Sequence, residues 1–264
     1  MDKIKIKSVS EYLENVNSFE QQHIAQWVFR GQGNDEYDLI PSLFRIDLEN
    51  TFIDWKDLEE YMLKVFEREA RPFSEFQPND ALELLSIAQH HGLPTRLLDW
   101  STNPLVALFF AVEDYKSEVK NSAVWCYGFP STHNCHPTST RIDKRLTLEK
   151  GNQIIFPTHV SPRITTQSGC FTLHDLPEGR EKFVPFNQQA DIFGMLDLFV
   201  INKKYRKKIL DELYELGYHH GLIYPGLDGI SKRIKYEAST THERCTNERQ
   251  LKKLFGKYKQ APKR

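Results

Sequence analysis

The sequence has no hydrophobic run long enough to cross a membrane. Its longest apolar run is the nine residues from Pro104 to Val112, whereas a membrane-spanning helix needs about 20. The first 16 residues carry charges throughout and contain no apolar stretch of the kind that defines a signal peptide. These absences predict a cytoplasmic protein that does not interact with a membrane.

Cysteine is also scarce. The four residues Cys126, Cys135, Cys170 and Cys245 form no C-x-x-C pair, which argues against a zinc ribbon and against a secreted disulfide scaffold. We therefore expect reduced thiols. The segment HNCH at residues 133–136 contains zinc-binding residue types, but its spacing fits neither a helical nor a knuckle site, so no metal is expected.

Several catalytic signatures are missing. The sequence has no G-x-S-x-G, H-E-x-x-H, G-x-x-x-x-G-K-S/T or paired-carboxylate motif, which argues against hydrolases, zinc proteases and nucleoside triphosphatases. The net charge of −1 gives no overall attraction to nucleic acid. The charge is uneven, because residues 201–264 hold 16 Lys and Arg against 7 Asp and Glu, and the rest of the chain holds 19 against 29.

The composition is that of a soluble globular protein. Of its 264 residues, 39% are hydrophobic, 27% charged and 12% aromatic, a balance that excludes fibrous and wholly disordered chains. No internal repeat, low-complexity segment or Pro/Gly/Ser-rich linker divides the chain. We therefore expect one domain.

Helical patterns dominate the first half of the sequence. Helices are predicted over residues 8–26, 54–71, 80–92 and 102–115, and a short strand over residues 27–29. The third helix has an N-cap at Asn79 or Asp80, and the fourth has one at Ser101 or Thr102. Apolar residues surround the fourth helix on nearly all sides, which predicts a buried central helix.

The second half is richer in β-branched and aromatic residues. Strands are predicted over residues 122–129, 152–156, 163–173 and 195–201, followed by a helix over 203–216 and then a strand, a turn and a helix within 221–234. The fold class is therefore α+β. We expect a single domain with a helical first half packed on a mainly antiparallel sheet that the second half largely forms.

Polar residues are most concentrated in the segment AQHHGLPTRLLDWSTNPLVALFFA, residues 88–111. They are Gln89, His90, His91, Thr95, Arg96, Asp99, Ser101, Thr102 and Asn103. A buried polar group without a partner costs about 1–3 kcal/mol, so these side chains must bind a ligand or one another. The structural alternative is a network in which Arg96 and Asp99 form an ion pair.

A second candidate site is FRGQG at residues 29–33. Arg30 ends a predicted strand and precedes glycines, so backbone can approach a ligand while the guanidinium offers donors suited to phosphate. The segment lacks the third glycine of a dinucleotide fingerprint. In the alternative, this is a glycine turn whose arginine pairs with Asp35 or Glu36.

The predicted strand within residues 162–171 is a third candidate. Alternation places Arg163, Thr165 and Gln167 on one face. Such a face suits the lining of a cleft, and it equally suits an exposed edge strand.

Together these segments resemble the FRG domain, a family named for its opening Phe/Tyr-Arg-Gly. The resemblance lies in FRGQ at 29–32, PSLFR at 41–45, the segment 88–111 and an R-x-x-x-Q-x-G-x-F pattern that begins at Arg163. It covers about residues 20–235, which leaves an N-terminal helix start at 1–19 and a basic C-terminal extension at 236–264. The family is widespread in bacteria and phages, and some members look associated with defence or toxin systems.

The FRG domain has in turn a remote similarity to the ADP-ribosyltransferase fold, which binds NAD. This similarity implies that Arg30 holds the phosphate or ribose of NAD and that Gly31 offers backbone groups to the nicotinamide amide. Ser101 or Thr102 would stand for the middle motif, and Gln167 falls where a later-strand Glu is expected.

A glutamine at that position cannot stabilise the positive charge that develops as nicotinamide leaves. Either another carboxylate supplies the charge, with Asp99 the first choice, or the domain binds a nucleotide without turning it over. His90 would act as a donor or an acid/base group near neutral pH. Arg96 would contact the ligand or orient Asp99.

The resemblance thus implies binding of NAD or a related nucleotide as a substrate, transfer of ADP-ribose, and no permanently bound cofactor. The expected catalytic residues are Arg30, His90, Asp99 and Gln167, and the expected cofactor-binding residues are Arg30, Gly31, Gln32, Arg96, Ser101 and Thr102. Two alternatives stay open. One is a non-catalytic recognition module for nucleic acid or protein, and the other is a nuclease toxin that uses His90, Asp99 and the basic C-terminal stretch.

Overall fold

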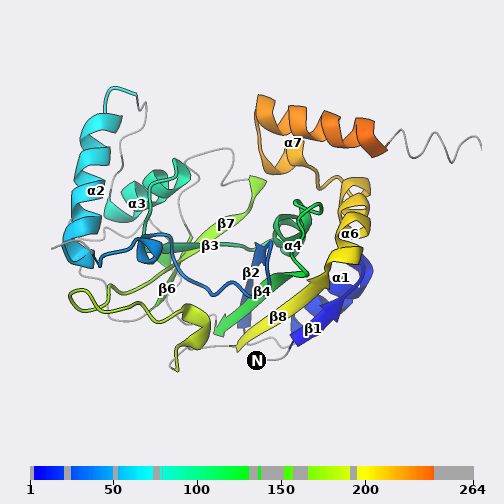
Figure 1. Ribbon diagram of the computed structural model, residues 1–264, viewed down its shortest axis with the longest axis horizontal. Coiled ribbons are helices and arrows are strands. Elements are labelled where there is room, and N and C mark those ends of the chain that lie inside the picture. Colours follow the sequence, from blue (N-terminus) through cyan, green and yellow to red (C-terminus); the bar gives the residue numbers. More distant parts are fainter. Residues whose placement is uncertain are drawn as a thin grey trace, which may run out of the picture.

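A computed structural model gives the arrangement of the chain. It describes residues 3–20, 25–49, 53–73, 78, 80–130, 136–137, 152–156, 166–190 and 195–240. Within these residues the framework is an eight-stranded sheet with the order β1-β8-β4-β2-β3-β7-β6-β5 (Figure 1). The strands are β1 Lys3–Ile6, β2 Ala25–Gln32, β3 Leu97–Ser101, β4 Asn121–Pro130, β5 His136–Pro137, β6 Gln153–Phe156, β7 Gly169–Leu173 and β8 Met195–Asn202.

The sheet is mainly antiparallel, as predicted. Five neighbouring pairs are antiparallel, while β1 with β8 and β5 with β6 are parallel. The expectation that the second half largely forms the sheet is wrong, because β2 and β3 lie at its centre and both come from the first half.

Strand β3 was not predicted, because its residues were assigned to a connection between two helices. It has Leu97, Leu98 and Trp100 buried and Asp99 exposed, and so short an apolar run cannot be distinguished from a helix segment by periodicity. The opposite error occurs at residues 221–224. A strand was expected there, but the structure has α7, His220–Ile223, with the side chain of His219 as its N-cap.

The longer helices lie near their predicted positions, but the prediction for the first one was too long, because Ala25 and Gln26 belong to β2. These helices are α1 Val9–Glu20, α2 Trp55–Ala70, α3 Ala81–His90, α4 Pro104–Val112 and α6 Lys203–Glu215, with a further helix over residues 227–240. Asp54 and Asp80 cap α2 and α3 through their side chains, and Gly217 follows α6 with a φ of 87°. Helix α4 starts later than predicted, because Asn103 is its N-cap and Ser101 belongs to β3.

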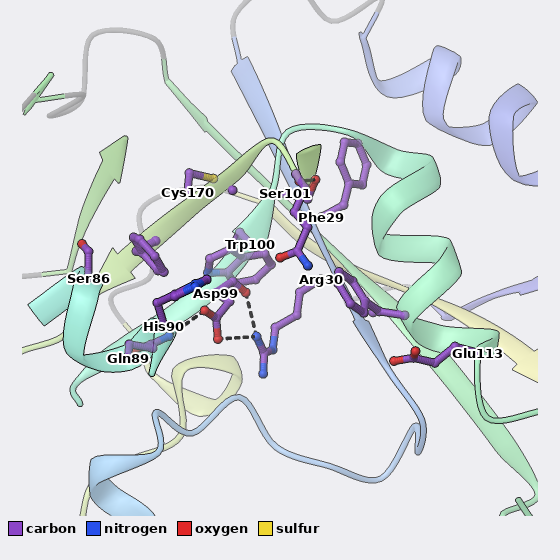
Figure 2. Close-up of a pocket in the computed structure, with 15 residues that line it drawn as sticks. Phe29, Arg30, Ser86, Gln89, His90, Asp99, Trp100, Ser101, Glu113 and Cys170 are labelled. Atoms are coloured by element: carbon purple, nitrogen blue, oxygen red, sulfur yellow. Dashed lines mark hydrogen bonds and ion pairs between the residues drawn. The ribbon is translucent and has the colours of Figure 1, made fainter. Parts of the chain in front are cut away.

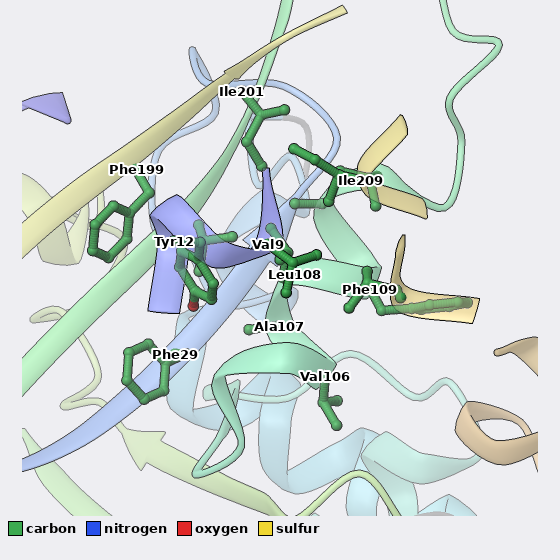
Figure 3. Packing of buried hydrophobic residues seen from close by; sticks show 14 of the residues in the cluster. Val9, Tyr12, Phe29, Val106, Ala107, Leu108, Phe109, Phe199, Ile201 and Ile209 are labelled. Atoms are coloured by element: carbon green, nitrogen blue, oxygen red, sulfur yellow. The ribbon is translucent and has the colours of Figure 1, made fainter. Parts of the chain in front are cut away.

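Helix α4 is the predicted buried central helix. Figure 3 shows its residues Val106 to Phe109 packed among side chains of α1, β2, β8 and α6. The helix approaches β2 so closely that a Cβ at Gly31 would lie 1.9 Å from the carbonyl oxygen of Ala107. Only glycine fits this position, and the close contact brings the C-terminal end of α4 beside Arg30.

Cys126 and Cys170 are buried and reduced, whereas Cys135 and Cys245 lie outside the described residues. No helix in the described ranges combines the length and the apolar character that a bilayer crossing requires.

Candidate functional site

A cavity of about 380 Å³ opens at the centre of the sheet, between β2, β3, α3, α4 and the segment that leads into β7 (Figure 2). It is lined by Phe29, Arg30, Gly31, Ser86, Gln89, His90, Asp99, Trp100, Ser101, Phe110, Glu113, Gln167, Gly169, Cys170 and Phe171. The three candidate segments of the sequence therefore contribute to one cavity. Its size lies within the range of small-molecule sites, about 300–1,000 Å³.

The cavity exists because the sheet opens between β2 and β3. The two strands share a single register pair, Phe29 with Ser101. Beyond this pair the Arg30 side chain bridges the strands, since its Nη1 donates to the backbone carbonyl of Asp99 at 2.7 Å. The same nitrogen lies 3.6 Å from Asp99 Oδ2.

The Arg30 guanidinium is largely buried, with 18% of the side chain exposed. Burial lowers the pKa of Arg30 and the Asp99 carboxylate raises it, and the group stays a cation because arginine does not deprotonate in proteins. Its Nε is buried and has no hydrogen-bond partner among the described residues. A buried donor of this kind favours a ligand that can accept from it.

Asp99 is held from its other side by α3. Gln89 Nε2 donates to Asp99 Oδ1 at 2.6 Å, and Gln89 Oε1 accepts from the hydroxyl of the buried Thr95. Asp99 itself is 61% exposed. The polar residues of the 88–101 segment therefore fix the direction of an accessible carboxylate.

His90 and four aromatic residues complete this part of the wall. His90 lines the cavity and packs edge-to-face on His91, with ring centroids 5.2 Å apart. The apolar surface comes from Phe29, Trp100, Phe110 and Phe171.

Glu113 also lines the cavity, and the sequence reading missed it. It follows α4 as the C-cap, and its two carboxylate oxygens lie 2.9 and 2.8 Å from the hydroxyl of Tyr224. A signal was available: Glu113 is three residues after Phe110, so both lie on the same face of the helix end.

Gln167 and Ser101 line the cavity, but their polar groups contact protein. Gln167 lies in a turn before β7 and not on the expected strand. Its side-chain Nε2 donates to the backbone carbonyl of Ile223 at 3.0 Å, and its backbone carbonyl accepts from Ser101 Oγ at 2.6 Å. These contacts fasten α7 and the β7 turn to the cavity edge.

Three expected ligand-binding residues lie away from the cavity. Gln32 Oε1 accepts from Trp125 Nε1 at 2.9 Å, and exposed Thr102 donates to the Ser168 carbonyl at 3.4 Å. Arg96 is buried and its Nε lies 3.1 Å from Glu59 Oε2 on α2.

Both alternatives that predicted an ion pair therefore named the wrong partner for the arginine. Arg96 pairs with Glu59 and Arg30 with Asp99, not Arg96 with Asp99, and not Arg30 with Asp35 or Glu36. Residues three apart on an extended chain face opposite sides of a sheet, which separates Arg96 from Asp99.

Two predicted features fall outside the described residues. Arg163 and Thr165 of the third candidate lie there, as do His133 and Cys135 of the HNCH segment. In the part of the chain that the structure covers, no three His, Cys, Asp or Glu side chains are grouped as metal ligands.

Comparison with known proteins identifies one domain. Residues 25–120 match the family model of the FRG domain, so this chain contains an FRG domain over that segment. The matched segment includes Arg30, Gln89, Asp99 and Glu113. No curated protein and no solved structure matches the chain.

Proposed function

We propose that the FRG domain of this chain binds NAD in the cavity between β2 and β3 and transfers its ADP-ribose group. The observation that carries the proposal is the Arg30 guanidinium. It is buried in an aromatic-walled cavity beside a fixed carboxylate, and its Nε lacks a partner among the described residues.

Arg30 suits a phosphate of the ligand. A guanidinium presents a rigid, planar set of donors that matches phosphate oxygens, and such charge-assisted hydrogen bonds are about twice as strong as neutral ones. Asp99 engages Nη1, which leaves Nε as a donor without a partner among the described residues. A phosphate there would satisfy the buried donor.

The remaining charges favour NAD over a nucleotide that carries only negative charge. Among the described lining residues, the Arg30 cation faces the two carboxylates of Asp99 and Glu113. A polyphosphate without a cation would be repelled by this balance. The nicotinamide ring of NAD is a flat cation, which is attracted both by carboxylates and by the faces of aromatic rings such as Phe110 and Trp100.

The transfer step requires a carboxylate near the sugar. The bond between ribose C1′ and the nicotinamide nitrogen breaks, its electron pair leaves with neutral nicotinamide, and C1′ becomes cationic. A hydroxyl or water then bonds to C1′ and loses its proton to His90 or solvent. Asp99, held by Gln89 and Arg30, provides the negative charge that stabilises the cation. Gln167 has no charge to offer the cation, and its role in the proposal is to line the wall of the cavity.

Incubation with NAD tests the proposal. The purified protein is given NAD labelled on the adenylate, and released nicotinamide and labelled protein are measured, with the exposed Arg68 changed to Ala as the control variant. Nicotinamide release that Arg30→Gln abolishes and R68A retains supports transfer. The molecule that carries the label identifies the target of the transfer, and the identity of this target would indicate whether the protein has a defence or toxin role. Binding of NAD is measured in parallel by calorimetric titration. Binding without release supports a domain that holds the nucleotide without turning it over, and absence of both binding and release overturns the proposal.

A further inference from the structure

Glu113 stands across the Arg30 guanidinium from Asp99. Figure 2 shows the two carboxylates on either side of Arg30, with Glu113 at the end of α4. Its side chain is 27% exposed, so the carboxylate borders the cavity and remains accessible from it. No family motif pointed to this residue, and its position comes from the packing of α4 on β2.

Tyr224 fixes the direction of this carboxylate. Its hydroxyl lies 2.8 and 2.9 Å from the two oxygens. The Tyr224 ring is held by Phe110, with ring centroids 6.1 Å apart and an interplanar angle of 78°, and by Lys232 Nζ 4.9 Å from the ring centroid. The phenol therefore cannot swing freely, and Glu113 keeps one orientation.

The histidine beside Glu113 does not act as a counter-ion at neutral pH. His220 Nε2 lies 4.0 Å from Glu113 Oε2, and His220 Nδ1 lies 2.6 Å from the hydroxyl of Tyr214. Burial, followed by the nearby charges of Lys232 and His219, lowers the pKa of His220 to about 4. Glu113 is thus oriented by a hydroxyl and not neutralised by this imidazole.

A carboxylate that a hydroxyl orients in the wall of the cavity suits hydroxyl groups of a ligand. It has about four acceptor positions on two oxygens, so it can accept from Tyr224 and from ligand hydroxyls together. A carboxylate and a guanidinium that line the same cavity match a sugar that bears both hydroxyls and a phosphate, and carboxylates are the usual partners of ribose hydroxyls.

We infer that Glu113 is a ligand-contacting residue that accepts hydrogen bonds from the vicinal hydroxyls of a ribose, and that Tyr224 is its positioning residue. The inference rests on the proposed function for the identity of the full ligand. It adds a specificity, namely that the cavity selects ribonucleotides over their 2′-deoxy forms.

Calorimetric titration of two matched ligand pairs tests this specificity. The pairs are NAD with its analogue that lacks the 2′-hydroxyl of the nicotinamide ribose, and AMP with 2′-deoxy-AMP. Hydrogen bonds to a charged group contribute about 1.5–3 kcal/mol, which is a ten- to hundredfold change in affinity. The wild type should bind at least one ribose form about tenfold or more tightly than its deoxy partner, and Glu113→Gln should abolish this preference.

Two variants separate a positioning role from a structural one. Tyr224→Phe removes only the hydroxyl and should weaken the preference three- to tenfold in the wild-type background but leave it unchanged in the Glu113→Gln background. Glu118→Gln, at an exposed carboxylate six residues after the end of α4, is the control and should behave as the wild type. Thermal melting of each variant verifies that it is folded.

The outcomes separate this inference from the proposed function. If NAD binds and its deoxy analogue binds equally well, the Glu113 assignment is overturned while the proposed function stands. If NAD fails to bind but AMP shows the Glu113-dependent preference, the proposed function fails and the assignment stands. If neither NAD nor AMP binds, both are overturned.

Discussion

Arg30 and Asp99 join two central strands of the sheet through a side chain where the backbone ladder has ended. Arg30 Nη1 donates to the Asp99 carbonyl at 2.7 Å, just past the single register pair of Phe29 with Ser101. A sheet that continued here would have no cavity. Arg30 and Asp99 lie where the sheet opens, and they also supply the cation and one of the carboxylates of the candidate site.

The first prediction concerns Asp99. Because this side chain is 61% exposed, Asp99→Asn should change the free energy of unfolding by less than about 0.5 kcal/mol. It should lower the rate of nicotinamide release about 100-fold or more, since the charge that stabilises the cationic sugar is removed. Urea denaturation and a nicotinamide assay measure the two effects. A stability loss as large as that of Arg96→Ala would indicate that Asp99 is scaffold.

Arg96→Ala should have the opposite profile. Arg96 and Glu59 are both buried and lie 3.1 Å apart, and burial already raises the pKa of Glu59 despite its partner. Removal of the cation leaves a buried carboxylate unpaired, which costs about 3–5 kcal/mol. Urea denaturation should show this loss, whereas exposed Arg68→Ala should stay within about 0.5 kcal/mol of the wild type. Equal stability of the two variants would contradict the scaffold role of Arg96.

Gly31 and Gly33, two residues apart in the sequence, give a matched pair for a test of packing. An added Cβ at Gly31 would meet the Ala107 carbonyl at 1.9 Å, while one at Gly33 has no atom within 4 Å. Gly31→Ala should therefore destabilise the fold by about 3 kcal/mol or more, and Gly33→Ala should leave it nearly unchanged. Thermal melting compares them. Similar melting temperatures would show that α4 does not pack directly on β2.

The fourth prediction is a pH dependence that arises at His174. Its Nε2 lies 2.8 Å from Thr172 Oγ1, and burial lowers its pKa from 6.5 to about 3. Between these values the unfolded chain binds a proton that the folded chain does not, so this stability is complete above pH 6.5 and is lost as the pH falls toward 3. The slope from this group is at most about 1.4 kcal/mol per pH unit.

Urea denaturation at several pH values tests this dependence. His174→Gln should flatten the slope between pH 6 and 4, and the same change at exposed His91 should keep the wild-type slope. His220, whose pKa is lowered to about 4, contributes in the same direction and accounts for part of the slope that remains. An unchanged slope in the His174 variant would contradict the assignment.

Several of the residues that line the cavity could be chosen as candidates from the sequence, but the partners of these residues could not be predicted. Arg30, His90 and Asp99 could be chosen as candidates because they are polar residues in apolar surroundings, which is a local signal of the sequence. Their partners depend on register: Arg96 reaches α2 and Asp99 reaches β2 because β3 is a strand, and its short apolar run carries no clear period. Glu113 depends on the approach of α4 to β2, which no local pattern encodes.

The most direct measurement of the central claim is a calorimetric titration of NAD into the wild type and into Arg30→Gln, with Arg68→Gln as the control. The wild type and the control should bind one NAD per chain, and Arg30→Gln should bind at least tenfold more weakly, because a charge-assisted phosphate contact contributes about 1.5–3 kcal/mol. Equal binding by all three proteins would show that Arg30 does not hold the ligand, and no binding by the wild type would contradict the account as a whole.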